Sequence, residues 1–414
     1  MHLLPRRTAR TLTLTAALAV AVPVLSASGG PTTPVAAEAA PRVERLEPLV
    51  FAHRGASGYR PEHTLAAYDL AVRMGADVIE PDVVSTKDGV LVVRHENEIS
   101  GTTDIATRPE FAALRTTKTI DGTPLTGWFT EDLTLAQLRT LRAVERLPAA
   151  RDENTIHDGR YTVPTLTEVI DFAAAASRAT GRKIGIAPET KHPTYFDSIG
   201  LSLEEPLLQA LRDAGLNRRR ADVYVQSFEE ANLRDLRRLG LRTQVVQLTS
   251  AGATARPYDH VVAGDPETYA QMTTFAGLRQ VATYATVLAP DITQILPRDS
   301  TGGQQAPTRL VVDAHRAGLD VVPYTFRAEN SFLPAQYRRG TDPNAYGDVL
   351  SFLQDAFATG IDGFFIDQPD LGFAAREDLY GFEHGIAHPQ AAAVQPPAAQ
   401  QAEQQRELVT AGSG

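Results

Sequence analysis

The feature that most constrains the fold of this sequence is a repeated unit in which an amphipathic segment stops at a glycine and a short apolar run follows. The segment 65–75 places Leu65, Tyr68 and Val72 on one face and stops at Gly75. A glycine just past the last helical turn suits the left-handed conformation that often ends a helix. The same order of helix, glycine and apolar run recurs at Gly215, Gly240, Gly318 and Gly360.

Apolar runs of strand length accompany these helical segments. Alternating strands and helices imply parallel pairing through right-handed crossovers, and eight such units imply a closed barrel. The alternative, a doubly wound sheet, is disfavoured because no glycine-rich dinucleotide loop follows any of the runs. We therefore predict an α/β fold, a (β/α)₈ TIM barrel, over residues 48–384. Seven runs are clear and 280–288 is the eighth candidate, the seven being 49–54, 77–84, 183–189, 222–228, 243–248, 320–326 and 362–367.

One segment interrupts the repeat after the second strand region. Residues 101–163 contain no helix–strand unit of the barrel type, and they hold the only tryptophan, Trp128. We expect an insertion over the mouth of the barrel, where it either shapes a substrate pocket or serves as a structural cover.

The two ends of the chain differ in composition from the repeat. Arg6, Arg7 and Arg10 precede an apolar stretch that is short for a membrane span, and small residues follow, which is typical of a secretory signal. We predict a signal peptide over 1–28, a flexible leader over 29–47 and a disordered Ala/Gln/Pro-rich tail over 385–414. The protein is then secreted or extracytoplasmic, without stable membrane insertion. An uncleaved anchor is the alternative.

Charge and cysteine content exclude several classes of function. Removing residues 1–28, which hold three arginines and no acid, would take the formal charge from −10 to −13. A surface this acidic disfavours binding to nucleic acid, so no nucleic-acid partner is expected. The chain has no cysteine, which excludes disulfides, thiolate zinc sites and cysteine nucleophiles.

Three acidic residues belong to the second and third strand regions. Glu80 and Asp82 are two residues apart and would point the same way on one strand, and Glu189 ends the next unit. Carboxylates held together repel one another unless a cation lies between them. Oxygen ligands suit hard ions better than zinc. We predict that these three residues bind one divalent cation. Ca²⁺ is the first candidate and Mg²⁺ is the second.

Two histidines and two basic residues lie at the ends of the same strands. His53 and His95 can exchange protons near neutral pH, and Arg54 and Lys191 add fixed positive charge. Together with a cation they form a site for an anion, and a phosphodiester fits that description. The pattern does not decide which histidine is the acid, nor whether water or a substrate hydroxyl attacks. A purely structural reading, in which Arg54 braces Glu80, stays open.

Three further residues complete the candidate site. Phe228 and Tyr324 end the fourth and seventh strands, so we expect them to contact substrate. Glu62 follows the first strand, and we expect it to support the site through its neighbours. An alternative role for Glu62 is to cap the first helix.

The motifs "HRGASGYRPEHT" (53–64), "IEPDVVSTKDGVLVVRHE" (79–96) and "PETK" (188–191) resemble the glycerophosphodiester phosphodiesterase family, in its exported bacterial type. The later "VVPYTFRAEN" and "DGFFIDQPD" also resemble its closing strands. The resemblance covers about residues 50–373. It implies a TIM barrel with one divalent ion, and it assigns the roles given above, with Arg54 and Lys191 contacting phosphate.

The reaction implied by this resemblance is hydrolysis of a small glycerophosphodiester to sn-glycerol 3-phosphate and an alcohol. Glu96 stands where the family often has aspartate, and "PEHT" replaces the commoner Pro-Glu-Asn-Thr. An alternative is a phospholipase D-type enzyme acting on lysophospholipids, sphingolipids or glycerol-phosphate cell-wall polymers. A noncatalytic phosphate-binding protein is the third possibility, but it would require a degenerate site, and no expected site residue is missing.

Overall fold

The structure is a computed structural model, and it describes residues 47–381. The predicted signal peptide, the leader up to residue 46 and the tail lie outside the described residues. Within the described part of the chain, no helix has both the length and the apolar character needed to cross a bilayer.

Parallel strands, paired with one another in a continuous order, occupy eight positions of one ring. β12 and β13 join the ends of the ring, because Asp362 N donates to Val321 O at 2.8 Å and Phe365 N donates to Pro323 O at 3.0 Å. The predicted TIM barrel is therefore confirmed. In ring order the strands are β1 (Leu49–Ala52), β2 (Val78–Ile79) continued by β3 (Asp82–Ser85), β7 (Gly185–Ile186) continued by β8 (Glu189–Thr190), β9 (Tyr224–Ser227), β10 (Gln244–Thr249), β11 (Val287–Pro290), β12 (Asp320–Val321) and β13 (Gly363–Ile366).

Two of these strand positions are broken by a proline. Pro81 separates β2 from β3, and Pro188 separates β7 from β8. Proline has no N–H to donate to a neighbouring strand, so the ladder is interrupted there. Glu80 therefore lies in the gap between β2 and β3. The sequence had led us to expect Glu80 within a strand, and that detail is wrong.

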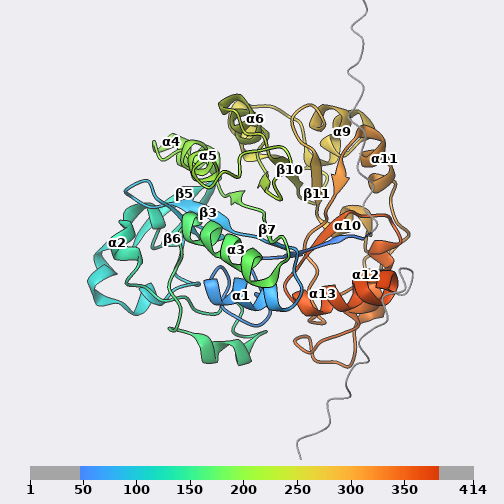
Figure 1. Cartoon of the computed structure of the whole chain (residues 1–414), viewed down its shortest axis with the longest axis horizontal. Coiled ribbons are helices and arrows are strands. Elements are labelled where there is room, and N and C mark those ends of the chain that lie inside the picture. The colour runs from blue at the N-terminus through green and yellow to red at the C-terminus, as the bar shows by residue number, and fades with distance from the viewer. Residues whose placement is uncertain (1–46, 382–414) are drawn as a thin grey trace, which may run out of the picture. The chain divides into compact units, whose positions relative to one another are not determined.

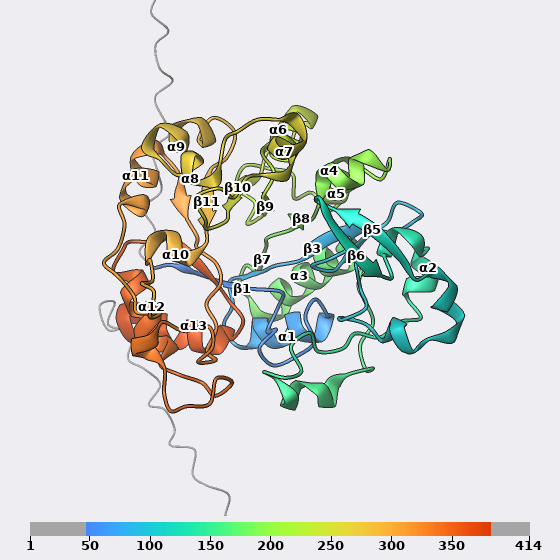
Figure 2. The ribbon, with the colours of Figure 1, turned by 180° about the vertical axis from the view of Figure 1, so that it is seen from behind.

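Helices surround the ring of strands, as Figures 1 and 2 show. The predicted ends at Gly240 and Gly318 are confirmed, since both glycines take the left-handed conformation at the C-terminal cap. The helices are α1 (Leu65–Arg73), α2 (Leu135–Leu138), α3 (Leu166–Thr180), α4 (Pro193–Ser198), α5 (Glu204–Asp213), α6 (Glu230–Leu239), α7 (Tyr258–Ala263), α8 (Tyr269–Met272), α9 (Phe275–Val281), α10 (Ile292–Ile295), α11 (Leu310–Ala317), α12 (Val349–Phe357) and α13 (Pro369–Arg376).

The eighth strand candidate, 280–288, is wrong in its first part. Its first two residues belong to α9, and the strand β11 begins only at Val287. The backbone N–H groups of Tyr284 and Ala285 both bond to Val281 O, which extends the helical end by a turn. The apolar pattern alone does not separate the end of a buried helix from the start of a strand.

The inside of the ring is a packed apolar core. Its aromatic centre is Phe51, whose ring lies 5.1 Å from that of Tyr224 and 4.8 Å from that of Phe365. Smaller side chains from β2, β10 and β11, together with Ala187 and Val322, complete this cluster. Because the barrel interior is filled, chemistry is confined to the rim.

Residues 101–163 connect β4 (Leu91–Val93) to α3. β4 runs antiparallel to β3, and β5 (Thr116–Ile120) forms an antiparallel hairpin with β6 (Thr123–Gly127). In Figure 2, β5, β6 and α2 lie together at one side of the strands. Short helices complete the segment and the rest of the fold: η1 (Asp104–Thr107), η2 (Pro109–Leu114), η3 (Thr130–Asp132), η4 (Asp152–His157), η5 (Ala335–Tyr337) and η6 (Glu377–Gly381).

Candidate active site

His53 and Asp367 meet because their strands are neighbours. β1 and β13 pair in register at Ala52 and Ile366, so the next residue of each strand reaches the rim side by side. His53 Nδ1 lies 2.5 Å from Asp367 Oδ1. Although burial favours a neutral carboxyl group, nearby guanidinium groups, Arg327 first and then Arg151, hold the pKa of Asp367 well below its usual range.

The charge on Asp367 determines which nitrogen of His53 carries the proton. An ionised carboxylate only accepts hydrogen bonds, so Nδ1 of His53 must be the donor. Arg54 Nε points at the other nitrogen, Nε2, from 3.3 Å. Burial, followed by the charge of Arg54, lowers the pKa of His53 to about 4. His53 therefore carries its lone pair on Nε2, where it accepts a hydrogen bond from Arg54 Nε.

His95 reaches the same site by a different route. It follows β4, which turns back along β3 and so carries His95 toward Asp82. Its Nδ1 lies 2.7 Å from Glu96 Oε1, and its Nε2 lies 3.3 Å from Lys191 Nζ. Burial, then the charges of Arg54 and Lys191, lower the pKa of His95 well below its usual value.

The three predicted metal ligands come together. Each of Glu80, Asp82 and Glu189 offers an oxygen, these oxygens lie within 4.8 Å of one another, and all three residues are buried. Burial, followed by the charges of Asp82 and Glu189, raises the pKa of Glu80 well above its usual value. Asp82 Oδ1 is buried and, within residues 47–381, has no hydrogen-bond partner. An unpaired buried oxygen beside two other carboxylates fits a divalent cation.

Lys191 is one of the positive charges already present at this trio. Its Nζ lies 2.7 Å from Glu189 Oε1. Gln226 Nε2 donates to Glu80 Oε1 at 3.0 Å. Asp82 and Glu189 are direct partners in the register between β3 and β8, which brings the last two ligands together.

His63, to which the sequence gave no role, positions the trio from behind. Its Nε2 lies 2.8 Å from Asp82 Oδ2 and its Nδ1 lies 2.9 Å from the Tyr68 hydroxyl, which donates to Glu80 O at 3.0 Å. His63 is fully buried. A histidine that also forms part of a turn motif next to the first helix gives no separate signal in the sequence.

Arg54 and Glu62 form the opposite wall. Arg54 N donates to Glu80 Oε2 at 2.8 Å, and its guanidinium pairs with Glu62 at 2.9 Å. Glu62 also accepts from Arg146 Nε, a residue of the 101–163 segment, at 2.7 Å. The two guanidinium groups, Arg54 first, hold the pKa of Glu62 well below its usual value despite burial. Glu62 thus joins the insertion to Arg54.

Backbone strain concentrates at this rim. Among residues 47–381, the non-glycine positions with positive φ are Arg54, His63, Asp121 and His192. His192 bridges Asp121 Oδ2 at 2.6 Å and Glu96 Oε2 at 2.9 Å, so it links the β5–β6 hairpin to the neighbour of His95. Such conformations cost of order 1–3 kcal/mol each and tend to occur at functional sites. The sequence did not reveal the Asp121–His192 pair.

A cavity of about 130 Å³ lies between these groups. Phe228 and Tyr324 line it with their rings 5.8 Å apart, and Lys191 Nζ lies 5.5 Å from the Phe228 ring centre. A larger neighbouring cavity of about 450 Å³ is also lined by Glu189, Lys191 and Phe228. The smaller cavity therefore adjoins a second space of ligand size.

A model of the glycerophosphoryl diester phosphodiesterase family matches residues 53–371. The chain belongs to this family. A glycerophosphodiester phosphodiesterase of Arabidopsis thaliana is 32% identical over 343 residues, covering 78% of this chain and 85% of the relative. One from Haemophilus influenzae is 27% identical over 348 residues, covering 79% and 89%.

Solved structures of phosphodiesterases share the fold. One from Silicibacter pomeroyi, named as a glycerophosphoryl diester phosphodiesterase, has a TM-score of 0.56 at 21% identity and covers 80% of this chain and 96% of that chain. A phosphodiesterase from Oleispira antarctica, in complex with the product sn-glycerol 3-phosphate, has a TM-score of 0.52 at 20% identity, with the same coverage. The glycerophosphoryl diester phosphodiesterase family is a hydrolase family. The residues of this chain that resemble its motifs lie at the rim of the barrel.

Every site residue that the sequence singled out lies at this rim, but their functional roles stay predictions. The predicted residues among those that line the smaller cavity are His53, Arg54, Glu80, His95, Glu189, Lys191, Phe228 and Tyr324. Asp82 and Glu62 adjoin them through the contacts given above. Asp367, His63, Asp121 and His192 are the contributors that the sequence analysis left without a role.

Proposed function

We propose that this protein is an exported, divalent-cation-dependent enzyme that hydrolyses glycerophosphodiesters to sn-glycerol 3-phosphate and an alcohol. The observation that carries the proposal is the cavity in which two neutral histidines face a trio of buried carboxylates. Family membership supports the same reaction, and the Oleispira antarctica structure supports sn-glycerol 3-phosphate as the product.

The carboxylate trio supports dependence on a cation. Glu80, Asp82 and Glu189 supply only oxygen ligands, which favours Ca²⁺ and then Mg²⁺ over zinc. A bound divalent cation would neutralise negative charge that builds up on the phosphoryl oxygens. His63 holds Asp82 in place from the protein side, and Lys191 adds a second positive charge for the phosphate.

The histidines would perform the proton transfers. His53 has its lone pair on Nε2 and its Nδ1 proton fixed by Asp367, which suits a general base that accepts a proton from the attacking water. His95, held by Glu96, would deliver a proton to the departing alcohol oxygen. An anionic substrate between the two rings raises both pKa values toward neutrality.

The larger cavity would accept the leaving alcohol. Its lining combines polar groups such as Asp121, Glu229 and Arg256 with the apolar side chains of Phe228, Val261 and Tyr269. The family reaction makes a soluble glycerophosphodiester the first candidate substrate, with a lysophospholipid as the alternative. Export is proposed from the arginines and apolar stretch at the N-terminus.

The test is release of sn-glycerol 3-phosphate from glycerophosphocholine, with lysophosphatidylcholine as the competing substrate. We expect His53→Ala and His95→Ala each to lower the rate by at least about 10²-fold. His315→Ala is a matched control, because His315, which belongs to α11, pairs with Asp362 and does not line the cavity. Full activity in either site variant, or faster turnover of the lysolipid, would contradict the proposal.

A further inference from the structure

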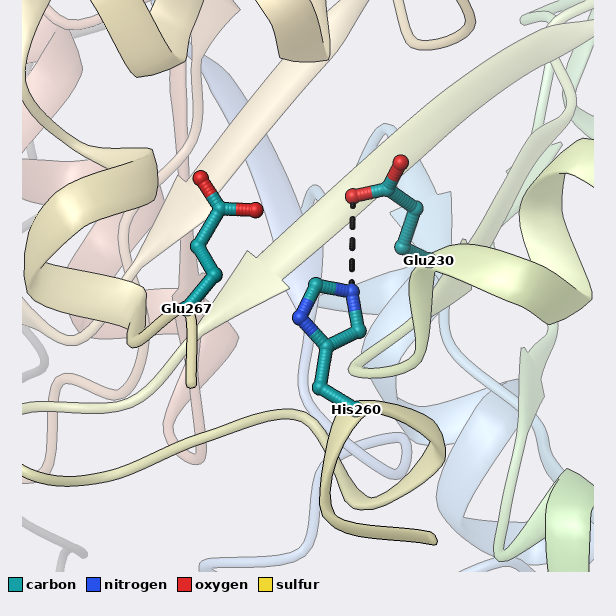
Figure 3. A group of neighbouring side chains, drawn as sticks. All are labelled: Glu230, His260 and Glu267. Carbon is teal, nitrogen blue, oxygen red and sulfur yellow. Dashed lines mark ion pairs between the residues drawn. The ribbon is translucent and has the colours of Figure 1, made fainter. Parts of the chain in front are cut away.

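A second group of metal-binding side chains lies outside the active site. Glu230 is the first residue of α6, His260 belongs to α7, and Glu267 lies in the loop before α8. One donor atom from each residue lies within 4.8 Å of the others. Figure 3 shows the imidazole ring of His260 between the two carboxylates. The group shares no residue with the trio at Glu80.

The nitrogens of His260 lie near acids without forming hydrogen bonds. The residue is 8% exposed, and its Nδ1 is buried with no hydrogen-bond partner within residues 47–381. Nε2 is 3.6 Å from Glu230 Oε2 and Nδ1 is 3.9 Å from Asp265 Oδ2, beyond ordinary hydrogen-bond length. Two ligands about 2.0–2.1 Å from a tetrahedral ion lie roughly 3.3 Å apart. The Nε2–Oε2 spacing is therefore close to that of two ligands of one ion.

The surroundings are short of positive charge. Arg234 Nε pairs with Glu230 Oε1 at 2.6 Å, which leaves Oε2 as the oxygen nearest to His260. Arg256, the other nearby cation, bonds to the Asp265 backbone oxygen. A cation placed among these groups would relieve the repulsion between the carboxylates.

We propose that Glu230, His260 and Glu267 form a second metal site, which takes a transition ion of the zinc class. An imidazole with two carboxylates suits Zn²⁺, whereas the all-oxygen trio at Glu80 suits Ca²⁺ or Mg²⁺. The two sites thus select different ions within one chain.

The position of this second site gives it a structural role. Glu229 and Tyr258, which line the 450 Å³ cavity, are one and two residues away from Glu230 and His260 in the chain. Tyr269, two residues after Glu267, lines the same cavity. An ion bound at the second site fixes the start of α6 to α7 and to the loop before α8. It therefore holds one wall of the cavity next to the catalytic residues.

The test is calorimetric titration of Zn²⁺ into the full-length protein saturated with Ca²⁺. We expect the wild type to bind one Zn²⁺. The Glu267→Gln and His260→Gln variants should each bind Zn²⁺ at least tenfold more weakly than the wild type does. In thermal unfolding, Zn²⁺ should raise the Tm of the wild type and not that of Glu267→Gln. His315→Ala is the matched control, and it should titrate as the wild type does.

Two outcomes would overturn the second site. One is an unchanged Zn²⁺ isotherm in Glu267→Gln, a half-exposed position where an isosteric change preserves folding. The other is loss of Zn²⁺ binding in Glu80→Gln alone, which would place zinc in the active-site trio. Neither readout involves hydrolysis, so failure of the proposed function would leave this test intact.

Discussion

Asp367 Oδ1 lies 2.5 Å from Nδ1 of His53, and this contact connects the last strand of the barrel to the first. This contact exists only because β13 and β1 are neighbours, and it fixes the imidazole with its lone pair on Nε2. The same carboxylate accepts from Arg151 at 2.6 Å and from Arg327 at 2.8 Å. One buried acid thus orients the proposed base and anchors the 101–163 segment.

We expect Asp367→Asn to lower kcat by about 10²–10⁴-fold, because an amide that donates to Nδ1 would place the proton of His53 on Nε2. Steady-state hydrolysis of glycerophosphocholine checks this, and KM should change much less than kcat. Asp370→Asn is the control, since Asp370 accepts from Tyr59 and has no contact with His53. Equal loss in both variants would contradict an orienting role.

We expect His63→Ala to weaken Ca²⁺ binding by about 10–100-fold, the range typical for residues that orient a metal ligand. The cause is loss of the 2.8 Å contact that holds Asp82. Tyr68→Phe keeps that contact and removes only the hydroxyl behind it, so its effect should be smaller. Ca²⁺ titration by calorimetry measures both, and an unaltered affinity in His63→Ala would refute the idea.

Removal of the cation should destabilise the protein, because Glu80, Asp82 and Glu189 then repel one another. Burial and these charges raise the folded-state pKa of Glu80, so the metal-free protein loses stability as pH rises. In chelator at pH 8 we expect Glu80→Gln to be more stable than the wild type by roughly 1–3 kcal/mol. With Ca²⁺ the order should reverse. Urea unfolding with and without Ca²⁺ distinguishes these cases, and an unchanged order would count against a cation site.

The pH dependence of stability should change in Glu229→Gln. Burial, followed by the charges of Asp259 and Asp121, raises the pKa of Glu229 to about 8. The pKa of Glu229 is higher in the folded state than in the unfolded state. Its contribution to the free energy of unfolding is therefore full at low pH, and it falls by about 1.4 kcal/mol per pH unit as pH rises between the two pKa values.

Relative to the wild type, Glu229→Gln should therefore gain roughly 2–4 kcal/mol of unfolding free energy between pH 5 and pH 9. Urea unfolding at a series of pH values measures this difference. Glu205→Gln, at an exposed position of α5, is the matched control and should run parallel to the wild type. A parallel curve for Glu229→Gln would show that Glu229 does not retain its proton in the folded state.

The sequence predicted the barrel and the positions of its motifs because these depend on short-range patterns. Helix periodicity, the glycines that end helices and the apolar runs are properties of neighbouring residues. The carboxylate trio was also predictable, since Glu80 and Asp82 share one strand region and Glu189 belongs to the next. The error at 280–288 arose where a helix end and a strand start are both apolar.

The contacts that refine the site were decided by the tertiary structure. Asp367 reaches His53 only after the eighth strand closes on the first, and His63 reaches Asp82 through a left-handed backbone turn. The Asp121–His192 pair depends on how a segment without periodicity folds back over the rim. Short-range pattern determines which elements form, whereas ring closure and packing determine which distant side chains meet.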